Sequence, residues 1–404
     1  MKRKLLSLAA VAACAFAGSA QAQISDGIVK IGVLNDMSGL YSDITGPGSV
    51  TAARMAVEDY IKATKSTLKV EIVSADHQNK PDVGSNVARQ WYDTDKVDMI
   101  ADVPTSSVGL AIAKLSADKG KLHVNSGSAT ADLSGKACNA NTIHWAYDTW
   151  MLANGTGKAI VKSGGDTWFF LTADYAFGQA LERDTEAVVL KNGGKVVGKV
   201  RTPFPTQDFS SFLLQAQASK AKIIGLANAG GDTTNSIKQA AEFGITKGGQ
   251  NLAGLLVFLP DVHSLGLNIA QGLKLTETFY WDLNDNTRAF TKRFAAAQGG
   301  KYPSMVQAGV YSSVIHYLKA VDAAKTDDGT KVAAKMKELP TDDPLFGKGT
   351  VRADGRKIHP AYLFEVKKPA ESKGPYDYYK LISTIPANEA FRPLAESECP
   401  LVKK

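Results

Sequence analysis

The sequence predicts an α/β protein made of two lobes, each a doubly wound parallel sheet. Strand patterns alternate with helix patterns through short loops, which is typical of βαβ units around a parallel sheet. The alternation covers residues 29–125 and then starts again over residues 167–259. Past residue 273 long helices and short strands replace it, so this last part of the chain must return to both earlier runs.

The first run contains four expected strands with helices between them. Apolar and alternating segments predict strands at 29–34, 68–75, 97–103 and 121–125. Apolar residues at helical spacing predict a helix from about residue 49, a second at 86–92 and a third that carries Leu110 and Ala113 inward. This run has the size of one doubly wound lobe.

The second run repeats the pattern without a sequence repeat that can be aligned. Strands are expected at 167–172, 195–201, 222–227 and 254–259, with helices at 178–191, 209–218 and 235–243. The remaining chain predicts a strand at 273–280, helices at 287–298 and 306–324, a hairpin near 354–356 and two short strands within 362–385.

Composition excludes several classes of protein. The 404 residues are 44% hydrophobic and 22% charged, far from the values of disordered chains and polytopic membrane proteins. Without Lys2, Arg3 and Lys4, which belong to a predicted signal segment, 44 basic residues face 40 acidic ones, without a basic stripe. We therefore expect no nucleic-acid partner.

Residues 1–22 have the features of a cleaved signal peptide. A basic start precedes an apolar run, and Ala20-Gln21-Ala22 forms a small-residue cleavage site. The expected location is the periplasm, with a mature chain that starts at Gln23. The run from Val11 to Cys14 also resembles a lipoprotein box, so lipid anchoring at Cys14 stays open as the alternative.

Removal of the signal segment leaves two cysteines, Cys138 and Cys399. In an exported chain, two cysteines indicate one disulfide, which would attach the tail to the body of the protein. Two unpaired buried thiols are the alternative.

No catalytic or metal-binding motif is found. Ser126-Gly127-Ser128-Ala129 lacks the second glycine of a nucleophile elbow, and the six histidines are scattered singly. Gly155-Thr156-Gly157-Lys158-Ala159 lacks the further glycine and the Ser/Thr of a phosphate loop. We therefore expect that the protein is not an enzyme and that it binds no cofactor and no metal.

Polar loops follow the strands at one edge of each expected sheet, where α/β proteins bind their ligands. They cover residues 37–46, 104–107, 125–130, 172–178 and 227–232. Their hydroxyls and helix N-termini suit an anion, and their aromatic residues suit a flat or apolar ligand body. Helix capping explains each loop alone, but five such loops at the sheet edges favour a binding site.

An ordered series of motifs resembles the periplasmic branched-chain amino-acid-binding proteins of ABC importers. The series begins with Ile31-Gly32-Val33-Leu34-Asn35-Asp36-Met37-Ser38-Gly39, Gly46-x-Gly48 and Ala53-Arg54-Met55-Ala56-Val57-Glu58-Asp59. It continues through 126–133, 174–178, 230–244, Tyr302-Pro303 and Tyr311-Ser312-Ser313. The resemblance implies two lobes joined by three crossovers, which close on a small solute and then dock on permease subunits.

The resemblance also places a ligand site. Its carboxylate-holding loop corresponds to Thr105, Gly127, Ser128 and Ala129, where the family often has Thr in place of Ala129. Ser106, in the same polar loop as Thr105, is a further candidate. The other positions that the resemblance implies are Tyr41, Thr45, Tyr175, Phe177, Asn228 and Ala229. Phe258 is a further candidate, because its apolar loop suits a wall against a ring or chain.

The chain departs from the family where amino-acid binders hold the ammonium group with an acid. Here Leu255-Leu256-Val257-Phe258 continues into Leu259-Pro260-Asp261, with no Glu and with Asp261 as the only nearby acid. A buried ammonium without a carboxylate partner costs several kcal/mol. The expected ligand is therefore a small organic acid, aromatic or aliphatic. The first alternative ligand is a branched-chain or related amino acid, and the second is a neutral amide or other solute.

The expected lobes are residues 23–145 with 275–349 and residues 146–274 with 350–404, hinged near residues 146, 274 and 350. We expect a monomer that serves an ABC importer. A ligand sensor subunit and an exported hydrolase are the further alternatives.

Overall fold

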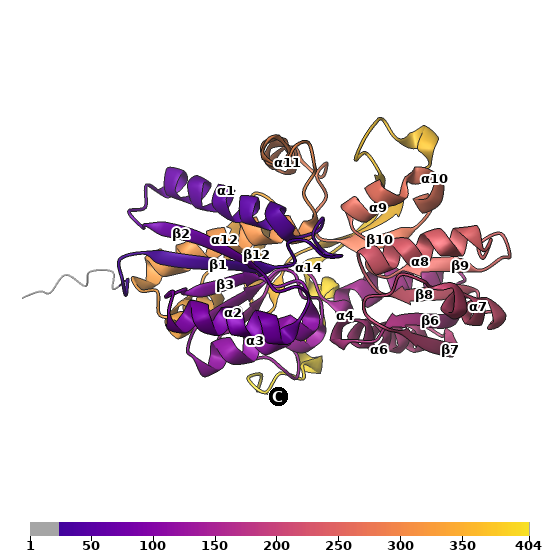
Figure 1. The fold of residues 1–404 in the computed structure, drawn as a ribbon, viewed down its shortest axis with the longest axis horizontal. Coiled ribbons are helices and arrows are strands. Elements are labelled where there is room, and N and C mark those ends of the chain that lie inside the picture. Colours follow the sequence, from indigo (N-terminus) through magenta and orange to yellow (C-terminus); the bar gives the residue numbers. More distant parts are fainter. Residues whose placement is uncertain (1–23, 404) are drawn as a thin grey trace, which may run out of the picture.

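The computed structural model describes residues 24–403, and the predicted signal segment with Cys14 lies outside them. Figure 1 shows two lobes side by side along the long axis of the molecule, each with helices on both sides of its own sheet. This arrangement confirms the expected fold class. None of the described helices is both long and apolar enough to cross a membrane.

The first lobe is built on a five-stranded parallel sheet with the order β2-β1-β3-β4-β5. Its strands are β1 (Val29–Asn35), β2 (Val70–Asp76), β3 (Met99–Asp102), β4 (Leu122–Asn125) and β5 (Thr142–His144). Its helices are α1 (Gly46–Thr64), α2 (Pro81–Asp93), α3 (Ser106–Asp118), α11 (Asp285–Ala297), α12 (Met305–Ala324) and α13 (Gly329–Glu338). Ile31 and Val33 of β1 belong to the same core as α1 and α12, whereas Leu34 packs in a separate core with Trp91 of α2. This division follows from the alternation of side chains along a strand.

The second lobe has a four-stranded parallel sheet with the order β7-β6-β8-β9. Its strands are β6 (Thr167–Ala173), β7 (Lys195–Thr202), β8 (Ile223–Ala227) and β9 (Asn251–Gly254). Its helices are α4 (Thr149–Leu152), α5 (Lys158–Lys162), α6 (Ala176–Lys191), α7 (Ser210–Ala218), α8 (Gly231–Glu242), α9 (Leu259–Leu265) and α10 (Leu267–Ala270). Phe170 packs with Leu181 of α6 on one face of the sheet, and Phe169 packs with Ile237 of α8 on the other.

The expected strand at 254–259 is wrong, because β9 ends at Gly254 and α9 begins at Leu259. The residues between them are buried, with Leu256 at 2% and Phe258 at 0% exposure. Leu256 and Phe258 line the cavity between the lobes, whereas Val257 packs in the core of the second lobe. A buried loop of this kind has the same apolar composition as a buried strand.

The faint phosphate-loop pattern at 155–159 lies in helical chain between α4 and α5, where residues Ala153–Gly157 form a π-helical turn. Gly155 packs against the side chain of Thr276, and Thr156 Oγ1 lies 2.8 Å from Thr276 Oγ1. The glycine here allows helix and strand to approach closely, so the segment joins the second lobe to β10 (Lys274–Glu277).

The last part of the chain returns to both lobes, as expected. Strands β11 (Thr341–Asp343), β12 (Gly347–Val351) and β13 (Lys357–Ile358) form an antiparallel sheet in contact with α12 and α13. Strand β14 (Ala361–Val366) instead pairs with β10 beside the second lobe, and β15 (Tyr379–Ile385) pairs with the other edge of β14. The chain thus passes from the sheet of β11, β12 and β13 to that of β10, β14 and β15 between residues 358 and 361. The hinges near residues 146, 274 and 350 stay predictions.

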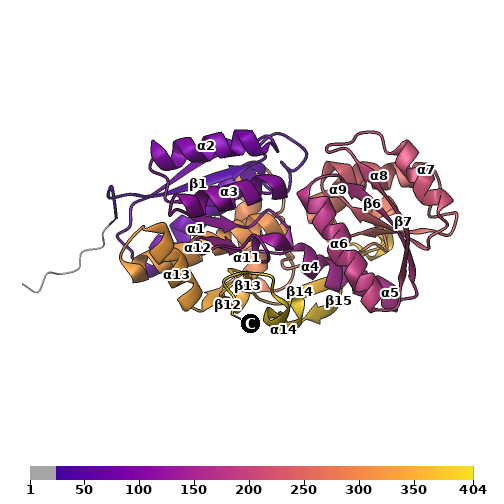
Figure 2. The ribbon, with the colours of Figure 1, turned by 90° about the horizontal axis from the view of Figure 1, so that it is seen from below.

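A disulfide joins Cys138 to Cys399, with the two Cα atoms 5.5 Å apart. The predicted bridge is thus present, and it attaches the tail to the first lobe. On its way there the tail passes the second lobe, where Asn154 Nδ2 donates to the carbonyl of Glu389 at 2.9 Å. Figure 2 shows this tail with α14 (Ala387–Ala390) below the junction of the lobes.

Candidate functional site

A cavity lies between the lobes, at the carboxyl ends of strands from both parallel sheets. Its lining residues are Tyr41, Ile44, Pro104, Gly127, Ala129, Tyr147, Tyr175, Phe177, Ala229, Leu256 and Phe258. The free space amounts to about 10 Å³, roughly that of one water molecule. Side chains of the two lobes therefore leave little free space between them in this structure.

The structure brings together seven of the residues that the sequence suggested, and they are Tyr41, Gly127, Ala129, Tyr175, Phe177, Ala229 and Phe258. Ile44 and Pro104 line the cavity from the polar loops identified in the sequence. Tyr147 and Leu256 were missed. Tyr147 follows β5, a three-residue strand too short to show periodicity, and Leu256 was hidden in the misassigned strand.

Two tyrosines close the cavity from opposite lobes. The hydroxyl oxygens of Tyr41 and Tyr175 lie 2.5 Å apart. Phe204 stacks on Tyr175 with ring centroids 4.1 Å apart and also reaches Tyr41 at 6.0 Å. Burial raises the pKa of both tyrosines well above the ordinary value of 10, so both hydroxyls stay neutral and can donate or accept hydrogen bonds.

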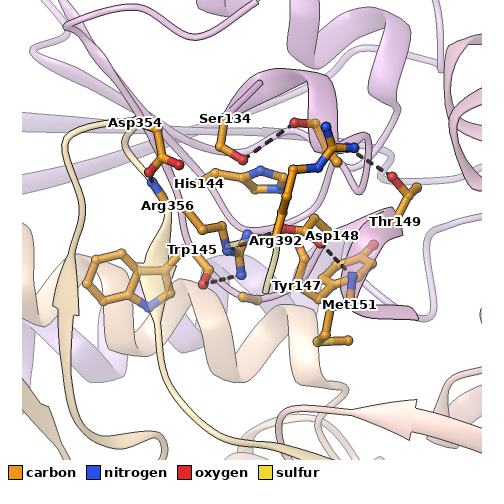
Figure 3. A network of polar contacts seen from close by, with 12 residues as sticks. Ser134, His144, Trp145, Tyr147, Asp148, Thr149, Met151, Asp354, Arg356 and Arg392 are labelled. Atoms are coloured by element: carbon orange, nitrogen blue, oxygen red, sulfur yellow. Dashed lines mark hydrogen bonds and ion pairs between the residues drawn. The ribbon is translucent and has the colours of Figure 1, made fainter. Parts of the chain in front are cut away.

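Tyr147 lies in the connection that leaves the first lobe, and Arg356 fixes this connection (Figure 3). The Arg356 guanidinium donates to the carbonyls of Tyr147 at 2.9 Å and Trp145 at 3.1 Å. It also lies 3.5 Å from the Asp148 carboxylate and 4.0 Å from the ring centre of Phe391. The Tyr147 hydroxyl in turn donates to the Gly127 carbonyl at 2.7 Å. Burial lowers the pKa of Arg356 to about 10, which still leaves it charged at neutral pH.

The polar side chains suggested as ligand contacts do not line the cavity in this conformation. Ser128 Oγ donates to the Val103 carbonyl at 2.5 Å, and Thr105 Oγ1 donates to the side chain of Asn79. The Ser106 hydroxyl accepts from the Thr130 N–H at 3.2 Å. Two further groups are also engaged inside the protein: Thr45 Oγ1 donates to the Tyr41 carbonyl at 3.1 Å, and Asn228 accepts from Thr233 Oγ1 at 2.7 Å. These groups shape the loops, whereas the backbone of Gly127 and Ala129 forms the cavity wall.

The wall beside Pro104 contains unusual backbone. Asp102 and Val103 have φ values of +78° and +57°, a region that β-branched residues rarely adopt. Ser126 and Gly127 both donate their N–H groups to the Asp102 carbonyl, at 3.2 and 3.1 Å, and hold this bend in place. Strain that the surroundings maintain is typical of binding sites.

No charged side chain lines the cavity among the residues described. Five buried acids lie within three residues of a lining residue. Two of them, Asp132 and Asp148, form ion pairs with Arg183 and Arg356. The other three are Asp102, Asp232 and Asp261. Burial raises their pKa values to about 6, 7 and 7 respectively. Asp261 accepts from the Phe258 N–H at 2.9 Å and so caps its own helix, α9. Across residues 24–403 no cluster of His, Cys, Asp or Glu forms a metal site.

The comparisons agree with this architecture. A model of the family described as "Periplasmic binding protein" matches residues 28–374. The chain belongs to this family. The resemblance seen in the sequence is thereby confirmed.

One curated relative and two solved structures illustrate what this periplasmic binding protein is similar to. A Leu/Ile/Val-binding protein homologue of Brucella melitensis is 24% identical over 94% of this chain and 96% of its own. A periplasmic binding protein of Burkholderia mallei is 51% identical, with a TM-score of 0.90 over 94% of this chain and all of that one. A branched-chain amino acid ABC transporter ligand-binding protein of Burkholderia xenovorans is 42% identical, with a TM-score of 0.82 over 93% of this chain and all of that one.

Proposed function

We propose that this protein is the periplasmic substrate-binding component of an ABC importer, and that it captures a small organic acid between two closing lobes. Among organic acids, an aromatic carboxylate fits best. The observation that carries this proposal is the cavity lining, which contains five aromatic rings and no charged side chain. Such a lining offers a ring apolar contact, and an ammonium group would find no carboxylate there.

Neutral groups at the cavity can hold a carboxylate. The N–H of Ala129 donates to no protein group in the described part of the chain. The first turn of the 13-residue helix α3 begins directly after Thr105, beside the cavity residue Pro104. Free N–H groups at a helix start and the positive end of the helix dipole attract anions. The hydroxyls of Tyr41 and Tyr175 are further donors for the polar end of a ligand.

A structure with the same fold supports the size and class of this ligand. A solute-binding protein of Rhodopseudomonas palustris, 20% identical with a TM-score of 0.79 over 93% of this chain and all of that one, was solved in complex with benzoate. At that identity it shows only that the fold accommodates an aromatic carboxylate. The argument for this chain rests on its own cavity.

A branched-chain amino acid is the second candidate, and the name of the relative that is 42% identical favours it. This candidate requires a carboxylate at the ammonium group. Asp261 is occupied as the cap of α9, and Asp102 and Asp232 are buried behind the wall. Asp132 and Asp148 are paired with Arg183 and Arg356. An amino acid would therefore bind only if one of these acids turned towards the cavity and ionised.

Calorimetric titration with benzoate, 4-hydroxybenzoate and leucine separates the two candidates. We expect the benzoates to bind and leucine to bind at least tenfold more weakly. Asp261→Asn and Asp232→Asn should change the affinity for benzoate less than twofold, whereas either change should abolish leucine binding if that acid pairs with an ammonium group. Leucine binding that is tighter than benzoate binding and is lost in one of these variants would overturn the organic-acid proposal.

A further inference from the structure

Three loops that follow neighbouring strands meet behind the first-lobe wall of the cavity. They follow β2, β1 and β3, which are adjacent and parallel, so their carboxyl ends lie at one sheet edge. The loop after β1 carries Tyr41, and the loop after β3 carries Pro104. The loop after β2 carries Asn79, which does not line the cavity.

The loop after β1 is folded around the carboxylate of Asp36, which has 0% exposure. This carboxylate accepts from the N–H groups of Gly39 at 2.7 Å and Tyr41 at 2.9 Å. Its third donor is Asn79 Nδ2, also at 2.7 Å. Hydrogen bonds to an ionised acceptor are among the stronger ones in proteins, so the position of Tyr41 depends directly on Asp36.

Asn79 connects this loop to the next one. Its side-chain carbonyl accepts from Thr105 Oγ1, and Thr105 precedes the first residue of α3 and follows Pro104. Gln78 and Asn79 have φ values of +53° and +58°, and the Asn79 N–H donates to His77 Nδ1 at 3.0 Å. Asn is one of the few residues that tolerate this backbone region. The left-handed turn at Gln78 and Asn79 therefore places the Asn79 side-chain amide between the loop of Tyr41 and the loop of Pro104.

An amide is suited to this position, because one side chain must donate to a carboxylate and accept from a hydroxyl. Aspartate in its place would set a second carboxylate against Asp36, and alanine would leave both neighbours without this partner. We propose that Asn79 is a positioning residue of the binding site, which holds the loops of Tyr41 and Pro104 in fixed relation before a ligand arrives. The identity of the ligand in this proposal rests on the proposed function. The fixed arrangement of the two loops, however, is a property of the ligand-free protein.

The test compares Asn79→Ala and Asn79→Asp with Gln78→Ala, the adjacent position with the same left-handed backbone and an exposed side chain. Hydrogen–deuterium exchange of the ligand-free protein should become faster in residues 36–45 and 103–107 of both Asn79 variants and stay unchanged in Gln78→Ala. Benzoate affinity should fall about tenfold in Asn79→Ala and further in Asn79→Asp. The Tm of Asn79→Ala should fall somewhat further than that of the control, because buried Asp36 and Thr105 lose a hydrogen-bond partner, so exchange and affinity, and not the Tm, decide the proposal.

A second arm distinguishes positioning from a general loss of stability. Because Asn79 acts partly through Thr105, Asn79→Ala and Thr105→Val should be non-additive: the double variant should lose little more benzoate affinity than Asn79→Ala alone. Unchanged exchange in both loops, or equal affinity losses in Asn79→Ala and the control, would overturn the proposal. If the unsubstituted protein fails to bind benzoate, the ligand assignment is wrong, and the exchange experiment still decides the role of Asn79.

Discussion

The carboxylic acid of Asp232 sits in the first turn of α8, three residues after the cavity residue Ala229, with 1% exposure. One of its oxygens accepts from the Thr206 N–H at 3.1 Å, and the other has no partner among the described residues. Burial raises its pKa to about 7, although the Thr206 N–H opposes this shift. The folded protein therefore keeps a proton on Asp232 at pH values at which the unfolded chain has released it.

This difference predicts a pH dependence of stability. Because the folded state binds the extra proton, the Asp232 contribution lowers the free energy of unfolding as pH rises from about 4 to about 7, and it stays constant above pH 7. Asp232→Asn should remove that part of the decline. Urea denaturation at pH 4 to 8 measures it, as the difference between variant and parent.

The control for this experiment is Asp82→Asn, at an exposed acid in the first turn of α2. Only the difference curve is informative, because burial lowers the pKa of His123 and His359 to about 3 and makes stability rise with pH below about 6.5. A difference curve for Asp232→Asn as flat as that of the control would contradict the prediction.

Single residues also show where sequence reasoning ends. Tyr41 and Tyr175 could be suggested from the sequence because the resemblance to the binding-protein family implies aromatic residues in their loops, and Phe258 because its loop is apolar. The Ser128 and Thr105 hydroxyls could not be assigned in the same way. A hydroxyl serves a ligand, a carbonyl or an amide equally well, and Ser128 points to Val103 only because residues 102 and 103 bend through positive φ.

At the scale of elements, the start of α8 in the second lobe lies against the loop after β1 in the first lobe, and a glycine stands at the point of contact. Gly230 has a φ of +56°, and a Cβ atom there would lie 2.6 Å from the Leu40 carbonyl oxygen and 2.9 Å from the Tyr41 ring. The neighbouring Gly231 N–H donates to the same Leu40 oxygen at 3.4 Å. Glycine thus permits the two backbones to meet.

We expect Gly230→Ala to hinder closure and to lower ligand affinity at least tenfold. Gly244→Ala is the matched control, because Gly244 has a φ of +64° with nothing within 4 Å of a Cβ atom. Both variants carry the backbone strain of a left-handed alanine, but only Gly230→Ala adds a clash across the lobes. Calorimetric titration of both with benzoate checks this. Equal affinity losses in the two variants would show that strain alone, and not closure, is responsible.

Elements with strong periodicity were predictable, and elements defined by tertiary contacts were not. The pattern located β6, α6 and α12 within a few residues, because each has a regular buried face. It missed β5, whose three residues are a strand only through pairing with β4. It also extended β9 into residues 255–258, where Leu256 and Phe258 are buried at the cavity between the lobes and Val257 packs in the core of the second lobe.

For the whole molecule, the disulfide closes a loop of 399 − 138 = 261 residues. Restricting the unfolded chain over so long a loop stabilises the fold by on the order of 5 kcal/mol, as an upper value. We expect Cys138→Ser with Cys399→Ser to lower the free energy of unfolding by up to this amount, as measured by urea denaturation. Intact mass of the unreduced parent should lie two hydrogens below that of the reduced protein. Two thiols that alkylate freely in native protein would contradict the pairing.

The proposed capture of a solute requires the lobes to separate and close, because the cavity in this structure has space for only about one water molecule. Closure is held by contacts that opening would break: the Tyr41–Tyr175 hydroxyl pair, the Gly231–Leu40 hydrogen bond and the ion pair of Arg183 with Asp132 at 3.1 Å. Exposed ion pairs and single hydrogen bonds each contribute only about 1 kcal/mol, so without a ligand these contacts leave open conformations accessible.

A bound solute adds contacts to both lobes at once and shifts the population towards closure, since a ligand favours the state that it binds more tightly. We therefore expect small-angle scattering to show a smaller radius of gyration at saturating benzoate than in the free protein. Tyr175→Phe keeps the ring and removes the hydroxyl contact between the lobes, so it should enlarge the free protein slightly and leave the bound radius nearly unchanged. An identical radius with and without saturating ligand would exclude closure as the capture mechanism, even if calorimetry shows tight binding.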